Sequence, residues 1–342
     1  MRLVRMLAAL IAALVAVPVT SASAWTRTPA TTFATLPAGA AHPEGITVDD
    51  AGNVYVATFD VGKPAGTPGE IFVFSPSGRL LRRLSVTGSS NLLLDLAFHP
   101  TTGALLVIDF GGKQLLTVNP FTGAATVFVT IPGGAAAGPN VLTFDAAGNV
   151  YISDSFQGVI WRTPPGGVAI TAWKTDPLLT TTGVPPFGAN GLAFNRAGDT
   201  LFVCNTGNDS VVRIAVVAGG NAGAASVFVN SVNGCDGLII DEQDNLWLAA
   251  NQADEIVVVN PAGRVIAKLG DFDGLDPKGA PRGLLFPASL VRSGEFIYVT
   301  NLSLDLRLFG LAPPVDALWA ADVRQHTVSK IPARIPPIPG LP

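Results

Sequence analysis

Short apolar segments alternate with polar turns along most of the chain, and this alternation repeats. The clearest unit is an apolar strand, a turn rich in Asp, Gly or Asn, and a second apolar strand, as in HPEGITVDDAGNVYVAT and GPNVLTFDAAGNVYISD. Six such units follow one another with a period of 45–51 residues, beginning at His42, Leu92, Gly138, Gly188, Cys235 and Ala280. A fixed period of this length is typical of a repeat fold.

Each unit continues with two further predicted strands. Third strands are expected at 70–74, 114–118, 159–162 and 256–259, and fourth strands at 125–131 and 265–269. Turn sequences such as SPSG and NPAG separate them, and helical spacing is nowhere sustained. The pattern predicts an all-β six-bladed β-propeller with four antiparallel strands per blade.

The two ends of the repeat array indicate how the ring closes. Residues 31–37, TTFATLP, are similar to the fourth-strand sequence ATVFVTIP, whereas residues 326–332, HTVSKIP, are similar to a third strand. We therefore expect the N-terminal segment to supply the outer strand of blade six, which leaves no open sheet edge. An alternative places the last two strands within 317–331.

The N-terminus has the features of a signal peptide. Arg2 and Arg5 precede an apolar stretch at 6–19, and Ala22-Ser23-Ala24 forms a small-residue cleavage site before Trp25. The predicted organisation is a signal peptide at 1–24, a propeller at 25–332 and a Pro-rich tail at 333–342. This predicts a secreted or periplasmic protein that leaves the membrane after cleavage, with an uncleaved anchor as the alternative.

Charge and cysteine content narrow the choice of partners. Charged residues make up 13% of the chain, the net charge is −4, and no basic cluster occurs, which argues against nucleic acid binding. Cys204 ends a predicted second strand and Cys235 begins a first strand in the next blade, so both lie on one face. In an exported chain they could form a disulfide, or remain as two buried thiols.

Long insertions gather on one face of the predicted ring. They occupy 59–69, 174–188, 271–281 and 302–325, whereas most turns between first and second strands are short. One-sided insertions usually build a binding site, here for a small-molecule substrate or for a protein partner.

A polar residue precedes the first strand of each unit on this face. The six residues are Glu44, Asp95, Asn140, Asn190, Asp236 and Arg282. Glycine follows four of them and would permit close approach of the converging strands. All six side chains should point at the mouth of the central channel.

The chemistry of this ring suits a hard cation. Clustered carboxylates repel one another, and a cation relieves that repulsion. The oxygen-only set Glu44, Asn140, Asn190 and Asp236 favours Ca²⁺ over Mg²⁺, with other divalent cations possible. The alternative is that these side chains solvate a water-filled channel without a metal.

A second repeated polar position lies at the end of the second strand. Its members are Asp109, Asp154, Asn205 and Asn301. We expect them to bond loop amides at the strand exits, with Asp154 also able to shape the pocket.

Several motifs resemble one family of propellers. They are EG at Glu44-Gly45, PN at Pro139-Asn140, NGLAF at 190–194 and DGLIIDEQDNLW at 236–247. Over about residues 40–332 the chain resembles the SMP-30/gluconolactonase/LRE-like family, which includes senescence marker protein-30 and is related to squid-type diisopropylfluorophosphatases and paraoxonases. The resemblance implies that Glu44, Asn140, Asn190 and Asp236 bind the catalytic divalent metal.

The chain also departs from that family pattern. Gluconolactonase-like members commonly read EGP-x-W, whereas this chain reads Glu44-Gly45-Ile46-Thr47, which argues against sugar-lactone specificity. Arg282 stands where arylesterase and phosphotriesterase relatives carry a histidine, which argues against those activities. VCNTGNDSVVRI at 203–214 resembles the NHL repeat, whose propellers are often binding modules.

These observations predict a secreted Ca²⁺-dependent hydrolase that opens a lactone or ester. The metal would polarise the carbonyl, and Asp236 would act as general base or nucleophile. Arg282 would bind a substrate carboxylate or phosphate, or pair with Asp95; Asp95 and His42 are further candidate substrate contacts. The alternative function is a non-enzymatic NHL-type propeller, and a strictosidine-synthase-like propeller is disfavoured by the acidic and amide ring.

Overall fold

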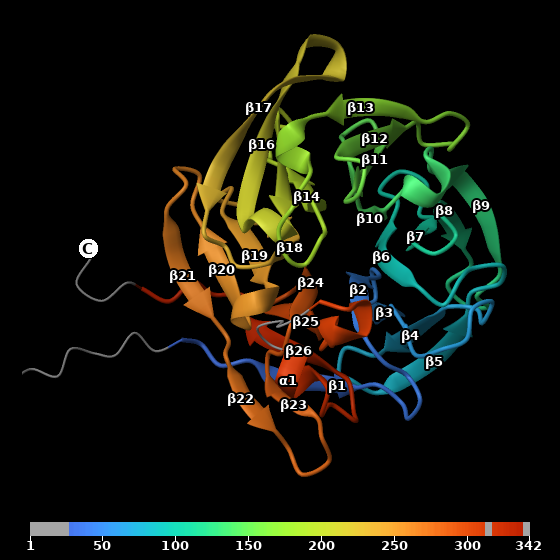
Figure 1. Ribbon diagram of the computed structural model, residues 1–342, viewed down its shortest axis with the longest axis vertical. Coiled ribbons are helices and arrows are strands. Elements are labelled where there is room, and N and C mark those ends of the chain that lie inside the picture. Colours follow the sequence, from blue (N-terminus) through green and yellow to red (C-terminus); the bar gives the residue numbers. More distant parts are fainter. Residues whose placement is uncertain (1–26, 312–316, 338–342) are drawn as a thin grey trace, which may run out of the picture.

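The strands form six four-stranded antiparallel sheets arranged as blades around a central axis (Figure 1). The computed structural model describes residues 27–311 and 317–337. The predicted signal peptide at 1–24 and the last five residues of the predicted tail lie outside these described residues. The six-bladed all-β prediction is confirmed.

Each blade runs outward from its innermost strand to its edge. The first three are β2 (Pro43–Val48), β3 (Val54–Thr58), β4 (Glu70–Phe74) and β5 (Leu80–Ser85); β6 (Leu93–Phe98), β7 (Leu105–Asp109), β8 (Gln114–Val118) and β9 (Ala125–Thr130); and β10 (Pro139–Phe144), β11 (Val150–Asp154), β12 (Val159–Thr163) and β13 (Thr171–Thr175). The fourth and fifth are β14 (Ala189–Phe194), β15 (Thr200–Asn205), β16 (Ser210–Val217) and β17 (Asn221–Asn230); and β18 (Cys235–Ile240), β19 (Leu246–Ala250), β20 (Glu255–Val259) and β21 (Val265–Leu269).

Blade six joins the two ends of the chain. It contains β24 (Pro287–Ser293), β25 (Phe296–Asn301), β26 (Thr327–Pro332) and, as its outer strand, β1 (Thr31–Thr35). Thr31 pairs with Lys330 and Thr35 with Thr327, so the predicted closure by an N-terminal strand is confirmed. The alternative of two strands within 317–331 is wrong, because 317–320 forms the short helix α1 (Ala317–Ala320).

The first strand of blade six begins later than the sequence pattern suggested. The segment that we aligned with the other first strands instead forms a small hairpin of β22 (Phe272–Leu275) and β23 (Pro281–Gly283), which projects beside the ring (Figure 1). β24 itself lies within 287–295, where the predicted alignment would place the turn between the first two strands of this blade. The insertion at 271–281 therefore builds its own two-stranded element.

Apolar side chains fill the spaces between blades. Strands such as β3 and β4 are buried along their whole length, because each blade packs against a neighbour on both of its faces. Tyr55 and Leu105 belong to the cluster between blades one and two, and Phe202 and Leu248 to the cluster between blades four and five. None of the helices within 27–311 and 317–337 qualifies as a membrane span.

A recurring hydrogen-bond arrangement shapes several short turns on the face opposite the long loops, where Asp49, Asp145 and Asp241 each accept the backbone N–H of the residue four places later. Asp241 accepts hydrogen bonds from the backbone N–H of Gln243 and Asn245 and from the indole N–H of Trp247. Burial alone would raise the pKa of Asp241, but these bonds lower it below its usual value. Asp241 is thus a turn residue, in contrast to Asp236 five residues earlier.

Candidate metal and substrate site

Four of the predicted ring residues meet at one end of the central channel. In each of four blades, the first residue of the innermost strand pairs with the last residue of the second strand, and the ring residue follows directly. This shared register brings together Glu44, Asn140, Asn190 and Asp236, all of which line a single cavity. All four side chains are buried, with at most 5% of their surface exposed.

Glycine allows the innermost strands to approach closely just beyond the ring residues. A Cβ atom on Gly45 would lie 2.3 Å from the carbonyl oxygen of Leu94, and one on Gly191 would lie 2.2 Å from that of Asp236. Gly237 is similarly close to the carbonyl of Ala288, at 2.5 Å. The three glycines therefore permit the convergence that brings the ring side chains together.

Three oxygen atoms of the ring residues are buried without a hydrogen-bond partner, and a fourth, Asn251 Oδ1, belongs to the amide that supports Asp236. The three ring oxygens are Glu44 Oε2, Asn140 Oδ1 and Asn190 Oδ1. Buried oxygens are normally paired, and leaving one unpaired costs about 1–3 kcal/mol. Three such atoms lining one space fit the oxygen-only coordination that Ca²⁺ prefers.

The orientation of both amides is fixed by hydroxyl groups behind them. Ser155 Oγ donates its one hydrogen to the carbonyl of Ala189 at 2.7 Å, so its 2.9 Å contact with Asn140 must be an N–H donated by the amide. Thr206 Oγ1 likewise donates to the carbonyl of Cys235 at 2.8 Å and accepts from Asn190 Nδ2 at 2.9 Å. With their nitrogens committed, the two amides present only oxygen to the cavity.

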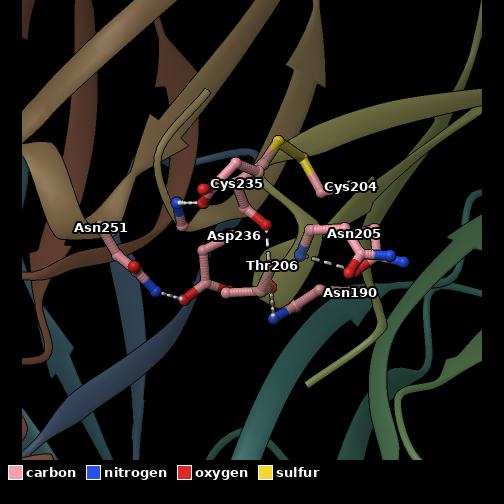
Figure 2. The surroundings of a disulfide bond; sticks show 10 residues. Asn190, Cys204, Asn205, Thr206, Cys235, Asp236 and Asn251 are labelled. Atoms are coloured by element: carbon pink, nitrogen blue, oxygen red, sulfur yellow. Dashed lines mark hydrogen bonds between the residues drawn. A yellow bond between two sulfur atoms is a disulfide. The ribbon is translucent and has the colours of Figure 1, made fainter. Parts of the chain in front are cut away.

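Asn251 holds the carboxylate of Asp236 in a similar way. Its Nδ2 atom donates to Asp236 Oδ2 at 3.0 Å, and Figure 2 shows the two side chains pointing toward one another beside Thr206 and Asn190. Ligand-supporting hydrogen bonds of this kind orient metal-binding side chains and hold their donor atoms in place.

The ring carboxyls are electrostatically costly when no cation is present. Burial raises the pKa of Asp236 to about 7, against the hydrogen bond from Asn251 that lowers it. Burial, with repulsion from Asp236 and Asp95, raises the pKa of Glu44 well above its usual value. A nearby cation would favour the charged form of both groups.

The candidate ligand set contains two carboxylates and two amides. Within the described residues no group of three His, Cys, Asp or Glu side chains is placed to hold a metal ion. Any metal ion held here would therefore need the two amide oxygens as well as the two carboxylates.

Asp95 does not belong to this ring. By register Leu94 takes the ring position of blade two and lines the cavity, so the predicted alignment is wrong by one residue. The Asp95 carboxylate accepts the backbone N–H of Leu142 at 3.0 Å and lines a separate cavity between the innermost strands. The run Leu92-Leu93-Leu94 allowed either register in the sequence. Burial raises the pKa of Asp95 to about 7.

Arg282 also lies away from the ring, and its predicted position is wrong. It is exposed in β23, and its guanidinium donates to the carbonyl of Asp273 across the hairpin. The expected pairing with Asp95 is absent from the described structure. Ala288 takes the ring position of blade six by register, since Pro287 pairs with Asn301.

His42 lies behind the cavity wall. Its Nδ1 atom is 3.1 Å from the carbonyl of Leu302, and its ring packs edge-on against His326 with centroids 4.6 Å apart. Burial lowers the pKa of His42. In the described part of the chain it supports the loop carrying Leu302 and does not line the cavity.

The two cysteines form a disulfide beside the ring. Cys204 and Cys235 are joined, with Cα atoms 5.3 Å apart, and Figure 2 shows the bond next to Thr206 and Asp236. The disulfide links β15 of blade four to β18 of blade five. It thus connects the strands next to Thr206 and Asp236.

The second polar column has the structural role that we expected. Asp154 accepts the backbone N–H groups of Gly138, Phe156 and Gln157, and Asn301 accepts that of Leu285. The residue directly after the second strand contacts the ring in three blades and was not predicted: Ser155, Thr206 and Asn251. The counterparts in the other three blades, Phe59, Phe110 and Leu302, are apolar.

Comparison with known proteins fits this geometry. The SMP-30/gluconolactonase/LRE-like region model matches residues 97–270, more than half of the chain. The chain belongs to the SMP-30/gluconolactonase/LRE-like family. The prediction from the sequence motifs is confirmed, although the motif at Glu44 lies before the matched region. No curated protein sequence matches the chain.

Solved structures of this family share the fold. A luciferin-regenerating enzyme superposes with a TM-score of 0.64 at 16% identity, covering 88% of this chain and 94% of its own. Regucalcin from Agrobacterium tumefaciens, a calcium-binding protein, gives 0.60 at 17% identity, covering 91% and 99%. A gluconolactonase from Xanthomonas campestris gives 0.60 at 14% identity, covering 90% and 98%.

Proposed function

We propose that this lactonase-type propeller hydrolyses a lactone or ester at a divalent cation, with Ca²⁺ as the first candidate. The observation that carries the proposal is the set of unpartnered oxygens of Glu44, Asn140 and Asn190, which share one buried cavity with Asp236. Family membership supports it, as do the calcium-binding regucalcin and the gluconolactonase among the structural neighbours.

Each residue of the ring has a defined role in this proposal. Glu44, Asn140, Asn190 and Asp236 would hold the cation, which when bound supplies Lewis-acid polarisation of a carbonyl group. The amides of Asn140 and Asn190 do not exchange protons near neutral pH, so they would position the cation and would not transfer a proton. Asp236 is the candidate base that takes a proton from the attacking water, and Asn251 holds its second oxygen.

The test is hydrolysis of a panel of lactones and phenyl acetate by the purified protein, with calcium and then with a chelator. Activity should require calcium and should fall by about 1,000-fold or more in Asp236→Asn, which keeps the shape of the side chain but cannot accept a proton. Asp50→Asn, at an exposed turn residue, is the matched control and should leave the rate unchanged.

Calorimetric titration with calcium separates binding from catalysis. Calcium binding without turnover of any substrate would favour the alternative of a binding propeller. Full activity in chelator, or in Asp236→Asn, would contradict the proposed mechanism.

We also propose export of the protein, as the N-terminal sequence predicts. The disulfide supports an oxidising compartment, because such bonds are rare in the cytosol. Mass spectrometry of the protein from the extracellular or periplasmic fraction should give a chain beginning at Trp25. A mature chain that retains residues 1–24 would contradict cleavage at this position.

A further inference from the structure

The cavity above the ring has apolar walls. Apart from the four ring residues, its polar side chains are Thr206, which is bonded to Asn190, and Asn251, whose Nδ2 is bonded to Asp236 and whose Oδ1 lies against Gly234. All other lining side chains are apolar: Phe59, Leu94, Pro185, Phe187, Phe286, Leu302, Leu304 and Leu306. A bound molecule therefore meets oxygen ligands at the floor and hydrocarbon around them.

Such walls discriminate against hydroxyl groups. A polyhydroxylated lactone would lose water from each hydroxyl without gaining a side-chain partner, and each unpaired hydroxyl weakens binding by about tenfold. An alkyl or aryl substituent gains affinity by leaving water for the same walls.

Aromatic side chains extend this apolar surface from the cavity toward solvent. Phe59 packs on Phe110 with ring centroids 5.6 Å apart, and Phe187 packs on Phe156 at 5.4 Å. Phe110 and Phe156 are themselves 5.7 Å apart, which joins the two pairs into one aromatic wall. Phe156 is 45% exposed, so the wall reaches the surface.

The loop that carries Phe187 is firmly docked. The carbonyl of Phe187 accepts the backbone N–H of Gly207 at 2.9 Å, and its N–H donates to the carbonyl of Pro185 at 2.8 Å. A Cβ atom on Gly183 would lie only 1.7 Å from the carbonyl oxygen of Gly207, so the two chain segments lie in direct contact. The aromatic wall is thus a built part of the cavity.

We propose that the substrate is an apolar lactone or ester, with an alkyl or aryl substituent that lies along Phe187 and the aromatic wall, and not a sugar lactone. This inference rests on the proposed function, since it concerns the substituent of the molecule hydrolysed at the same ring. It identifies Phe187 as a specificity-determining residue.

Two lactones with the same ring size test the proposal directly. In the calcium-loaded protein, kcat/KM for δ-decanolactone, which carries a pentyl chain, should exceed that for glucono-δ-lactone by about 100-fold or more, the loss expected when at least two of its four hydroxyls meet the apolar walls. A higher kcat/KM for glucono-δ-lactone would overturn the inference and leave the hydrolase function standing.

Substitution of Phe187 tests the position of the substituent. Phe187→Ala should lower kcat/KM for δ-decanolactone by about 10- to 100-fold, and for the unsubstituted δ-valerolactone by less than about threefold. Phe121→Ala, at a phenyl side chain that is 69% exposed, is the control and should change neither value. Equal losses on both substrates would overturn the assignment of Phe187.

The binding of lactams separates this inference from the proposed function. If no lactone or ester of the panel is hydrolysed, the proposed function fails, and calorimetry with δ-decanolactam and glucono-δ-lactam then decides the inference. Tighter binding of δ-decanolactam by about tenfold or more supports an apolar occupant. Tighter binding of glucono-δ-lactam, or no binding of either, overturns it.

Discussion

Asn251 shows how residues outside the ligand set determine the properties of the ring. It touches Asp236 through one hydrogen bond and has no counterpart among the residues that the sequence singled out. Substitution of supporting residues of this kind typically lowers metal affinity by about 10- to 100-fold. Ser155 and Thr206 act in the same way on the two amides.

Substitution of Asn251 should weaken calcium binding. Asn251→Ala removes the donor to Asp236 Oδ2, and we expect a loss of about 10- to 100-fold in calcium affinity by titration calorimetry. Asn221→Ala, at an exposed asparagine of blade four, is the control. An unchanged affinity in Asn251→Ala would show that the Asp236 carboxylate is held without it.

The raised pKa of Asp236 predicts how pH affects stability without a cation. Its pKa of about 7 in the folded protein exceeds the ordinary value of 3.8. Between pH 4 and 7 the unfolded chain therefore releases this proton while the folded protein retains it, so this group lowers stability as pH rises.

Comparison with Asp236→Asn isolates that contribution. In chelator, the variant should gain stability relative to the native protein by on the order of 2 kcal/mol between pH 5 and 8, measured by urea unfolding. Added calcium at pH 8 should make the native protein more stable than Asp236→Asn, because only the native ring has a second negative charge, at residue 236, with which to bind the cation. A pH-independent difference in chelator would contradict the burial argument.

The residues of the site were only partly predictable from sequence. Four ring residues could be placed because each stands at the same position, near the start of the first strand in a repeated strand–turn–strand unit. They are Glu44, Asn140, Asn190 and Asp236. Their supporting residues were missed because a Ser or Thr after a strand usually has a local role. Only the three-dimensional register shows which of them faces the ring.

At the scale of elements, the disulfide joins β15 and β18 across two blades. It closes a loop with a sequence separation of 31 residues, which corresponds to about 3–4 kcal/mol in the chain-entropy model. The linked strands flank Asn190 and Asp236, so the bond stabilises the blades that carry half of the candidate ligands.

Removal of this bond should lower the free energy of unfolding but leave the fold unchanged. The double variant Cys204→Ser/Cys235→Ser should lose about 3 kcal/mol in urea unfolding and keep a β-rich circular dichroism spectrum. The native protein in reductant should match the variant. If the two differ, the serine substitutions themselves, and not the loss of the bond, cause the change.

The strands were predicted well except in blade six. Strands such as β4, β8 and β21 have the bounds that the pattern gave, because their turns contain Gly, Pro or Asn at regular spacing. In blade six, Pro281-Arg282-Gly283 has the same polar residue followed by glycine that begins the first strand in other blades. The first strand of this blade actually begins at Pro287-Ala288-Ser289. Glycine is present at position 283 for a different reason: it ends the β22–β23 hairpin with a φ of +83°.

At the scale of the whole molecule, the ring depends on one antiparallel pairing between β1 and β26. Phe33 anchors β1 between the first and last blades, with its ring centroid 4.5 Å from that of Tyr298 and 6.4 Å from that of Phe74. The side chain is buried, so closure involves core packing as well as backbone hydrogen bonds.

Truncation of Phe33 should therefore weaken the entire fold. Phe33→Ala is expected to cost about 3–5 kcal/mol in urea unfolding, as for other buried phenylalanines. Phe121→Ala, on the exposed turn between β8 and β9, should cost less than about 0.5 kcal/mol. Similar losses in the two variants would mean that closure contributes little to global stability.

The β1–β26 pairing also sets an order for biosynthesis. Thr31 and Lys330 are 299 residues apart, so β1 leaves the ribosome long before its partner exists. At about 5–20 residues per second, the wait is roughly 15–60 s. During that time the first blade can assemble, but the strand that precedes it has no sheet to join. A nascent chain that stalls before residue 327 would keep that strand unpaired, as a ready target for chaperones and proteases.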